Sequence, residues 1–470
     1  MSVMEATGIP VGPAGTAVET LARHCAGVRY EDLTEEVRGR TRELILDHLA
    51  VTLGGATEES TRIIHSFVRD SAPTGPSSVI AGGMGTLPAW AALANGTASH
   101  AIEMDDVTRE SSLHPGVAVI PAALAVTEGE AAAPATLIAA VVAGYEVMIR
   151  VGNALDPAST YARGFHPTGV AGAFGAAAAA AVAMGLPEAQ CARAIGIVGT
   201  FASGSLEFLS DGSWSKRLNP GWAAHAGVLA ADLARRGFTG PLGALDGRLG
   251  ALRSYTDAPH PERLTDGLGM SAAILGVSIK PYACCRYNHG VIDGVLDLRE
   301  RHGLRAEHVS RIRLRLVSAA APIVAEPIDQ KRAPRTVVDA QFSAPFAAAV
   351  ALVRGAAGLA EYTQAVVDDP TVRSLMAKIE CQRDLSFDSR YPRAWPWAVE
   401  VDLADGSRLA IGMEHALGDP ERPVSRRALV DKFTSFGAAV LGSCGAEVAT
   451  RILTMGADDD LAAIIGPLRK

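Results

Sequence analysis

Three carboxylates crowd into one short segment of the chain. Glu103, Asp105 and Asp106 lie within four residues, and His114 follows eight positions later. Burial of neighbouring like charges would raise the pKa of at least one carboxyl, which makes this segment a candidate general acid or base. A solvated acidic loop that caps the next helix accounts for the same residues equally well.

Two further motifs combine histidine or lysine with structure-breaking residues. His166 precedes a proline and an Ala-rich stretch, so we expect it at a helix N-terminus, where the dipole lowers the pKa of an imidazole. Lys216 and Arg217 stand among tryptophan, proline and glycine, a setting suited to holding a carboxylate in a partly dry pocket. Capping for the histidine and snorkelling for the two cations are the alternative interpretations.

A fourth motif runs from Lys280 through Arg286 and Tyr287. It falls where the pattern of the chain changes, and clefts between domains are common places for small-molecule sites. Cations at such a junction favour anion binding, although solvated charges would fit as well. We interpret the adjacent Cys284 and Cys285 as core packing.

The elements that must position these residues are mainly helical. Apolar residues recur at helical spacing from about residue 18 to 273, and alternate with polar ones at 311–316 and 397–403, where Asp405-Gly406 suggests a hairpin to 408–413. Further helices are expected at 338–354, 370–378 and after 423. The predicted fold is mainly α: a large all-helical domain of residues 18–275 and 414–470, with a smaller α/β lid domain of residues 276–413 inserted between them.

Composition narrows the function classes. The chain has 470 residues and a formal net charge of −8, and without a basic stripe we expect no nucleic-acid partner. Residues 167–187 lack charge but are mostly alanine and glycine, so we predict a buried helix and no membrane partner. Six cysteines without a C-x-x-C pair and no signal peptide favour a cytoplasmic protein. Nucleotide-binding glycine loops, zinc-protease and serine-hydrolase motifs are absent.

Taken in order, these motifs resemble the MmgE/PrpD family. The resemblance rests on the acidic segment with His114-Pro, on G-F-H-P-T, on K-R-L-x-P-G-W-A-A-H, on K-P-Y-x-x-C-R and on Asp339-Ala-Gln-Phe-Ser. It spans roughly residues 20–436. It implies a homodimeric lyase that acts on small di- or tricarboxylates without a metal or organic cofactor, in a cleft between its two domains.

Carried over to this chain, the resemblance implies particular site residues. The catalytic residues would be Asp105, His114, His166, Lys216 and Lys280, and substrate would also meet Glu103, Arg286 and Tyr287. The lysines would hold substrate carboxylates, a histidine would move the proton, and the acidic segment would supply a second acid.

Four positions depart from the family pattern. Glu103 stands where aspartate is expected, Val107 where threonine often occurs, Asn219 where histidine is usual and Phe346 where tyrosine is common. Loss of donors at the last three positions predicts a substrate less polar than 2-methylcitrate.

Three other functions fit parts of the sequence. An epimerase on the same scaffold shares the first proton transfer, and a binding protein without activity could use the same cations. Asp105, Asp106 and Glu110 also fit the magnesium motif of all-α isoprenoid synthases, but the sequence holds no second metal motif.

Overall fold

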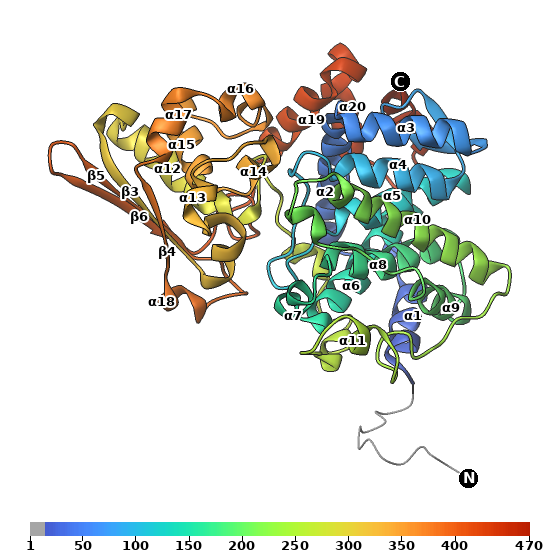
Figure 1. Cartoon of the computed structure of the whole chain (residues 1–470). Coiled ribbons are helices and arrows are strands. Elements are labelled where there is room, and N and C mark those ends of the chain that lie inside the picture. Colours follow the sequence, from blue (N-terminus) through green and yellow to red (C-terminus); the bar gives the residue numbers. More distant parts are fainter. Residues whose placement is uncertain (1–14) are drawn as a thin grey trace, which may run out of the picture.

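The computed structural model describes residues 15–470. The N-terminal segment, in which we predicted no signal peptide, lies mostly outside the described residues. Figure 1 shows a large helical part beside a smaller α/β part. The chain builds the helical part first, crosses to the α/β part near residue 280 and returns in its last helices. The mainly α fold with a smaller α/β part is therefore confirmed.

The helical part begins with α1 (Ala17–Gly27), α2 (Glu35–Gly55) and α3 (Glu59–Ser71). Its centre is formed by five helices: α4 (Pro88–Ser99), α5 (Gly116–Gly129), α6 (Pro134–Leu155), α8 (Pro167–Ala183) and α10 (Ser215–Arg235). The short α7 (Pro157–Ala162), then α9 (Glu188–Val198) and α11 (Ala251–Ser254), lie around them. The chain closes this part with α19 (Arg426–Leu441), α20 (Gly445–Leu453) and α21 (Leu461–Ile465).

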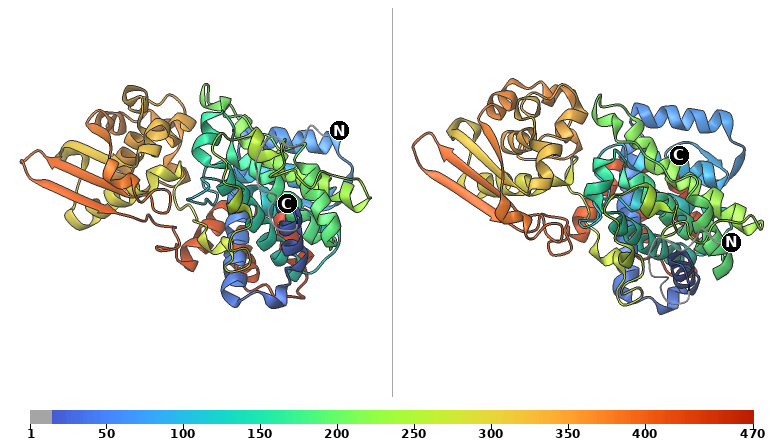
Figure 2. Two further views of the ribbon diagram at one scale, coloured as in Figure 1. Left: turned by 90° about the horizontal axis from the view of Figure 1, so that it is seen from below. Right: turned by 60° about the horizontal axis from the view of Figure 1, so that its bottom comes forward.

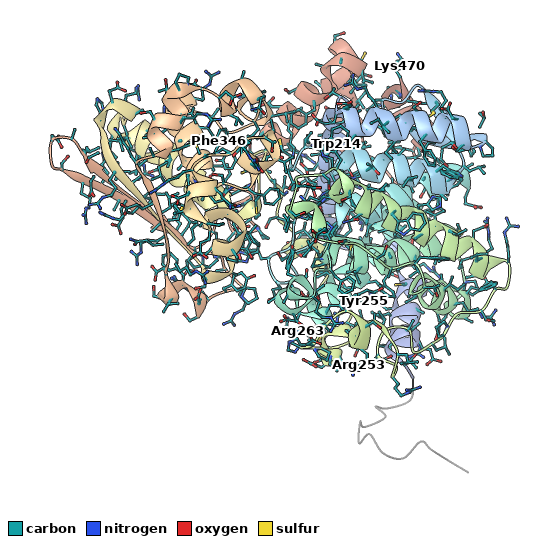
Figure 3. All side chains as sticks on the ribbon, viewed as in Figure 1. Trp214, Arg253, Tyr255, Arg263, Phe346 and Lys470 are labelled. Atoms are coloured by element: carbon teal, nitrogen blue, oxygen red, sulfur yellow. The ribbon has the colours of Figure 1, made fainter. Side chains whose placement is uncertain are left out.

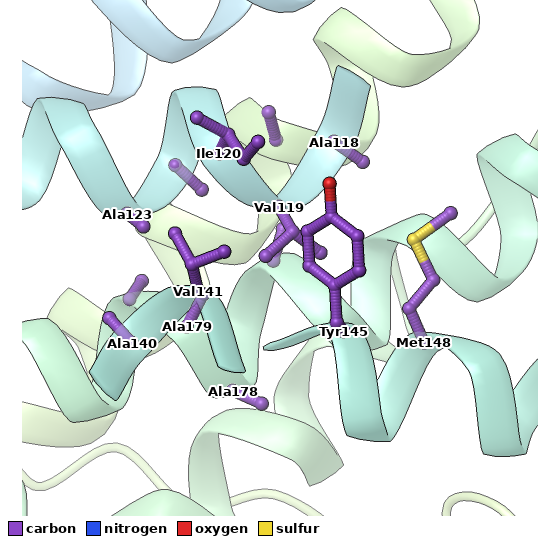
Figure 4. Close-up of a cluster of buried hydrophobic side chains, with 14 of the residues drawn as sticks. Ala118, Val119, Ile120, Ala123, Ala140, Val141, Tyr145, Met148, Ala178 and Ala179 are labelled. Carbon is purple, nitrogen blue, oxygen red and sulfur yellow. The ribbon is translucent and has the colours of Figure 1, made fainter. Parts of the chain in front are cut away.

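Small residues let the central helices approach closely. A methyl group at Gly221 of α10 would lie 2.2 Å from the Thr97 hydroxyl of α4, so only glycine fits this crossing. Alanines of α8 are buried from Ala176 to Ala181. Figure 4 shows the same kind of packing around Tyr145 of α6, whose hydroxyl points toward the Ala118 end of α5. This close crossing places the loop after α4 beside the first turn of α10.

The α/β part is a four-stranded sheet covered by helices. The strand order is β4-β3-β5-β6, built from β3 (Val309–Leu316), β4 (Ile379–Arg383), β5 (Trp397–Leu403) and β6 (Arg408–Met413). β3 pairs parallel with β4 and antiparallel with β5, and β5 and β6 form the predicted hairpin. The main covering helices are α12 (His289–His302), α15 (Ala344–Arg354) and α17 (Pro370–Met376), with the short helices α13 (Ile328–Lys331), α14 (Val337–Gln341), α16 (Gln364–Val367) and α18 (Leu385–Asp388) around them.

Each part has its own hydrophobic core. One cluster draws mainly on helices from α1 to α10 and again on α19 to α21. The other draws on α12, α15 and the sheet, and includes Val51 of α2 and the loop residues Ala101, Ile102 and Met104 where the two parts meet. Two turned views keep the α/β part to one side of the helices (Figure 2). The bounds predicted for the two domains, 18–275 with 414–470 and 276–413, remain a proposal that these two cores support.

Several elements differ from the sequence prediction. The stretch expected to be wholly helical contains a hairpin of β1 (Thr74–Val79) and β2 (Met84–Thr86). The helix predicted over 338–354 is two helices, because the Ser343 hydroxyl caps the second one at the Phe346 N–H (3.0 Å). The Lys216–Arg217 motif, expected among structure-breaking residues, lies within α10, which begins at Ser215 and accommodates Pro220 inside it.

Within residues 15–470, two helical stretches are long and apolar enough to cross a membrane, judged by length and composition alone. They are Pro134–Leu155 and Arg426–Leu453. The apolar window of the first is 83% buried in the helical core, which accounts for its composition, and that of the second is 39% buried. The Ala-rich segment forms α8, which is buried as predicted.

Candidate active site

A cavity lies where the two parts of the molecule meet, and both parts line it. Glu103, His114, His166 and Lys216 come from the helical part. The crossing segment supplies its remaining polar wall: Lys280, Cys285, Arg286 and Tyr287. All the residues carried over from the family resemblance line this cavity except Asp105, which lies directly behind its wall.

Asp105 organises the polar side of the cavity. Its Oδ2 lies 2.9 Å from Nδ1 of His100 and 2.9 Å from Nδ1 of His114, and its Oδ1 lies 3.5 Å from Nζ of Lys280. Burial alone would raise the pKa of this carboxyl, but Lys280 and the two histidines outweigh burial and hold the pKa well below its usual range. Asp105 is therefore an ionised acceptor for His100 and Lys280, with His114 at ion-pair distance.

This geometry sets the tautomers of two histidines. Because an ionised carboxylate and a backbone carbonyl only accept hydrogen bonds, His100 carries its proton on Nδ1 toward Asp105 and His114 carries its proton on Nδ1 toward the Asp106 carbonyl. This hydrogen bond of His114 is 2.7 Å long. With Nδ1 protonated, Nε2 carries the lone pair of the ring, and His114 lines the cavity, as a general base requires.

His166 occupies the N-cap of α8, as predicted. Its ring stacks at 5.8 Å on that of His100, and its Nδ1 lies 3.1 Å from the amide nitrogen of Asn219. The pKa of His166 is well below the usual range, first because the ring is buried and then because His100 and Lys216 are near. The predicted lowering is confirmed, with burial as its main cause. An imidazole that accepts from Asn219 at Nδ1 carries its proton on Nε2.

Two lysines enter the site from different elements. Lys216 lies in the first turn of α10 and contacts the Glu103 carboxylate, and its Nζ lies 5.0 Å from the centre of the Phe342 ring. Lys280 is fully buried and donates to the Glu103 carbonyl (3.1 Å). Burial lowers the pKa of Lys280, but Asp105 and Glu103 outweigh burial and raise it, so this ammonium stays charged.

Asp106 behaves differently from its neighbour. Its Oδ1 accepts from the Gly116 N–H (2.8 Å) and its Oδ2 from the Tyr145 hydroxyl (2.7 Å). Burial raises its pKa to about 7. The prediction that one carboxyl of this segment has a raised pKa is confirmed, but the main cause is burial rather than repulsion by Asp105. Asp106 does not line the cavity, and Glu110 lies apart at Arg263 (3.4 Å), so the run does not converge as a magnesium motif.

Arg286 reaches the cavity wall but is already paired. Its Nη2 donates to Asp419 Oδ1 (2.5 Å), which also accepts from the Ser278 hydroxyl (2.7 Å). The Nε of Arg286 is buried and has no hydrogen-bond partner among the described residues. Asp419 forms a ligand-like cluster with His415 and Glu421, yet Arg109 and Arg286 already neutralise these carboxylates.

Most of the remaining wall is apolar or aromatic. Tyr287 stacks on Trp395 (ring centres 4.2 Å apart) and shares a hydrogen bond with the Tyr391 hydroxyl (3.0 Å). The other wall residues are Phe342, which belongs to the Asp339-Ala-Gln-Phe-Ser motif, and six that the sequence did not single out: Ser112, Tyr161, Leu206, Phe208, Leu209 and Ile323. They come from loops and element ends scattered over the chain, so no local spacing marks them.

Two interpretations from the sequence need correction. Cys284 is fully buried, as a core residue should be, but Cys285 lines the cavity. Phe346 is buried in the core of the α/β part against Tyr362 (5.3 Å) and lies inside that part in Figure 3, so it removes no donor from the cavity. Val107 does line the cavity, and Asn219 acts on it through His166.

The fold and the site together define a class: a two-part helical protein whose buried cavity combines lysines, histidines and one orienting carboxylate. The chain belongs to the MmgE/PrpD family. The model of the MmgE/PrpD N-terminal domain matches residues 19–264, and that of the C-terminal domain matches residues 282–455.

Curated relatives cover most of the chain. It is 28% identical to the cis-aconitate decarboxylase-like protein oryM of Aspergillus oryzae, over 92% of each sequence. It is 29% identical to a cis-aconitate decarboxylase of Aspergillus terreus, over 87% of each, and 26% identical to the human cis-aconitate decarboxylase, over 90% of this chain and 88% of the relative. These relatives support a lyase of the MmgE/PrpD type.

Proposed function

We propose that the protein is a lyase that removes carbon dioxide or water from a small carboxylic acid, a di- or tricarboxylate or a related acid, with its own side chains as the catalysts. The observation that carries the proposal is the placement of His114. This histidine lines the cavity with Nδ1 beside Asp105 and the Asp106 carbonyl, and two lysines of the cavity supply positive charge.

The proposed mechanism follows from these positions. Lys216 and Lys280 attract the carboxylate, and they stabilise the negative charge that builds when a proton or carbon dioxide leaves the neighbouring carbon. In decarboxylation the electrons of the broken C–C bond stay on that carbon, which then takes a proton from protonated His114. In dehydration His114 removes the carbon-bound proton and the electrons of that C–H bond form a C=C bond. The C–O bond breaks, and the leaving oxygen takes the proton from protonated His114 and departs as water.

The second acid was predicted to come from the acidic segment, but a different residue has to play this role. Asp106 is enclosed by Tyr145 and Gly116 and lies outside the cavity wall. His166 lines the cavity and carries its proton on Nε2, so we assign it as the hydrogen-bond donor to the leaving or reacting oxygen.

Turnover in deuterium oxide tests the proposal. We expect wild-type protein to release carbon dioxide or water from cis-aconitate or a matched series of hydroxy and unsaturated acids, followed by NMR. His114→Ala should lower kcat by about 10²- to 10⁴-fold, the usual contribution of a general acid–base group. His260→Ala, at an exposed histidine outside the cavity, is the control and should keep wild-type activity.

Other outcomes would replace the proposal. Deuterium uptake into a substrate without loss of water or carbon dioxide identifies an epimerase. Binding of acids at unchanged affinity by wild type and His166→Ala, with no turnover by either, identifies a carboxylate-binding protein.

We also propose that the protein is a cytoplasmic homodimer. The described cysteines form no disulfide, which suits a reducing compartment. An apolar stripe of large, partly exposed side chains supports the dimer, because such surfaces mark contacts between proteins. The stripe consists of Ile63 and Phe67 on α3 and Leu218, Trp222 and Leu229 on α10.

A further inference from the structure

Asn219 of α10 contacts the ring of His166. It follows Lys216 by three residues in this helix, and its amide nitrogen, Nδ2, lies 3.1 Å from Nδ1 of His166. The same Nδ2 donates to the Ser205 carbonyl at 3.4 Å. One amide group therefore meets the imidazole and the backbone of a neighbouring segment at once.

The Ser205 carbonyl fixes the orientation of the amide. Because a carbonyl oxygen only accepts hydrogen bonds, it faces the NH2 group of Asn219, and a rotated amide would place two acceptor oxygens together. The second hydrogen of the NH2 group is then available to Nδ1 of His166. Nδ1 accepts this hydrogen bond, so the proton of the neutral ring is on Nε2.

The backbone holds both partners in this arrangement. The His166 N–H donates to the carbonyl of Gly204, the residue before Ser205, at 2.9 Å. A methyl group at Gly169, in the first turn of α8, would lie 3.4 Å from Cβ of Asn219, so the two helices are in contact here. The amide is thus held beside the imidazole from both sides.

The surroundings of His166 make the position of its proton matter. Among the described residues, Asn219 is the hydrogen-bond partner of this ring. Burial is the main reason that the pKa of His166 lies well below its usual range, so the ring is neutral near pH 7. The titratable groups around it are His100, Lys216, His114 and Asp105. A neutral imidazole donates from one nitrogen only, and Asn219 decides which one.

We propose that Asn219 is a positioning residue that keeps the proton of His166 on Nε2, so that this ring donates a hydrogen bond in the reaction and does not take up a proton. The use of this donor rests on the proposed function, but the position of the proton does not. The inference also divides the work of the two histidines, because His114 moves the proton and His166 only donates.

The position of the proton can be measured without any substrate. In ¹⁵N NMR of protein labelled in histidine, the signals of His166 are those lost in His166→Ala. Wild type at pH 7 should carry the proton on Nε2 and none on Nδ1. Asn219→Asp replaces the donor by a charged acceptor of the same shape, so Nδ1 of His166 should gain a proton and the pKa of the ring should rise by about one or more.

A second variant and a control accompany this measurement. Asn219→Leu removes the donor without adding a charge, so a fraction of the rings should carry the proton on Nδ1 even if Asn219→Asp folds poorly. Gln382→Glu makes the same amide-to-carboxylate change at an exposed residue of β4 outside the cavity, and it should keep the wild-type signals.

Turnover gives a second readout. In Asn219→Asp the ring keeps its Nε2 proton below the raised pKa, as an imidazolium, and loses it above that pKa. The kcat of Asn219→Asp relative to wild type should therefore fall with rising pH, by about 10²-fold or more, the usual cost of one donor.

The outcomes separate this inference from the proposed function. A wild type with the His166 proton on Nδ1, or one proton position shared by wild type and both Asn219 variants, overturns the inference, whatever turnover is found. The expected proton positions with absent turnover of every acid support the role of Asn219 and reject the lyase assignment. The expected positions with a kcat ratio that does not change with pH overturn the use of His166 as a donor in the reaction.

Discussion

Two neighbouring carboxyls, Asp105 and Asp106, show how strongly partners decide chemistry at the scale of single residues. Asp105 meets an ammonium and two imidazoles, and its pKa falls. Asp106 meets only neutral donors in a buried site, and its pKa rises to about 7. The first orients the site, and the second is a buried group whose raised pKa costs the fold stability as pH rises from about 4 to 7.

That cost gives a pH-dependent prediction for Asp106→Asn. Because the pKa of the folded state exceeds that of an unfolded aspartate, about 4, folding takes up a proton between these values, and the contribution of Asp106 to stability is lost as pH rises toward 7. Asparagine lacks this titration. From pH 4.5 to 7.5 the stability of Asp106→Asn should therefore rise relative to wild type by about 3 kcal/mol.

Urea unfolding at several pH values measures this difference and cancels the titration of other groups. Asp431→Asn, at an exposed carboxylate of α19, should show no trend against wild type. A flat difference for Asp106→Asn would show that Asp106 is ionised throughout this range.

The sequence could predict which side chains lie together, but not which carboxyl has a lowered pKa and which has a raised one. Their types and order along the chain pointed to His114, His166, Lys216 and Lys280, and all four line one cavity. His100 stands in the same segment and is the second imidazole on Asp105, yet nothing in its spacing separates it from a core histidine. The apolar wall depends on loops brought together by tertiary structure, so it left no local signal.

At the scale of elements, α19 contacts α2 and both segments that carry the site residues. Lys432 on this helix donates to Asp47 of α2 (2.6 Å), to the Met104 carbonyl (2.8 Å) and to the Lys280 carbonyl (3.1 Å). Those carbonyls belong to the two segments that carry Glu103, Asp105 and Lys280. One ammonium thus joins a helix and both site segments.

Removal of this ammonium should destabilise the protein strongly. Lys432→Met leaves the buried Asp47 carboxylate and two carbonyls without a donor, and we expect a loss of about 3–5 kcal/mol in urea unfolding. Arg427→Met on the exposed face of the same helix should change stability by less than about 0.5 kcal/mol. Adding Asp47→Asn to Lys432→Met should recover part of the loss. Equal effects of Lys432→Met and Arg427→Met would refute the role of Lys432.

Elements were predictable where periodicity was long. Helices such as α2 and α6 repeat apolar residues over more than five turns, and β5 and β6 flank a clear Asp-Gly turn. The β1–β2 hairpin and β4 are short, and β4 is specified by its parallel pairing with a strand some 65 residues earlier rather than by its own sequence.

At the scale of the whole molecule, the stripe on α3 and α10 is stiffened by aromatic contacts. Phe67 packs on Trp90 (6.0 Å), Trp90 on His225 (5.2 Å), and His225 on Trp222 (5.5 Å). In a two-fold dimer the same stripe would cover itself, apolar surface on apolar surface.

Sedimentation tests the dimer. Wild type should sediment at twice the chain mass of 48.7 kDa, and Trp222→Glu with Phe67→Glu should shift it to a single chain. Leu385→Glu, at an exposed leucine of the α/β part, should leave the dimer intact. A wild type of single-chain mass, or a double variant that keeps twice that mass, would rule out pairing through this stripe.

The three hydrogen bonds that Lys432 donates also have a consequence for biosynthesis. During translation Asp47 and the segments around Glu103 and Lys280 leave the ribosome long before residue 432, which completes their hydrogen bonds. The nascent chain therefore has to hold these segments without their shared donor until α19 emerges. These hydrogen bonds beside the candidate active site are therefore completed only when nearly all of the polypeptide has been made, and a ribosome-bound intermediate ending before α19 should lack them.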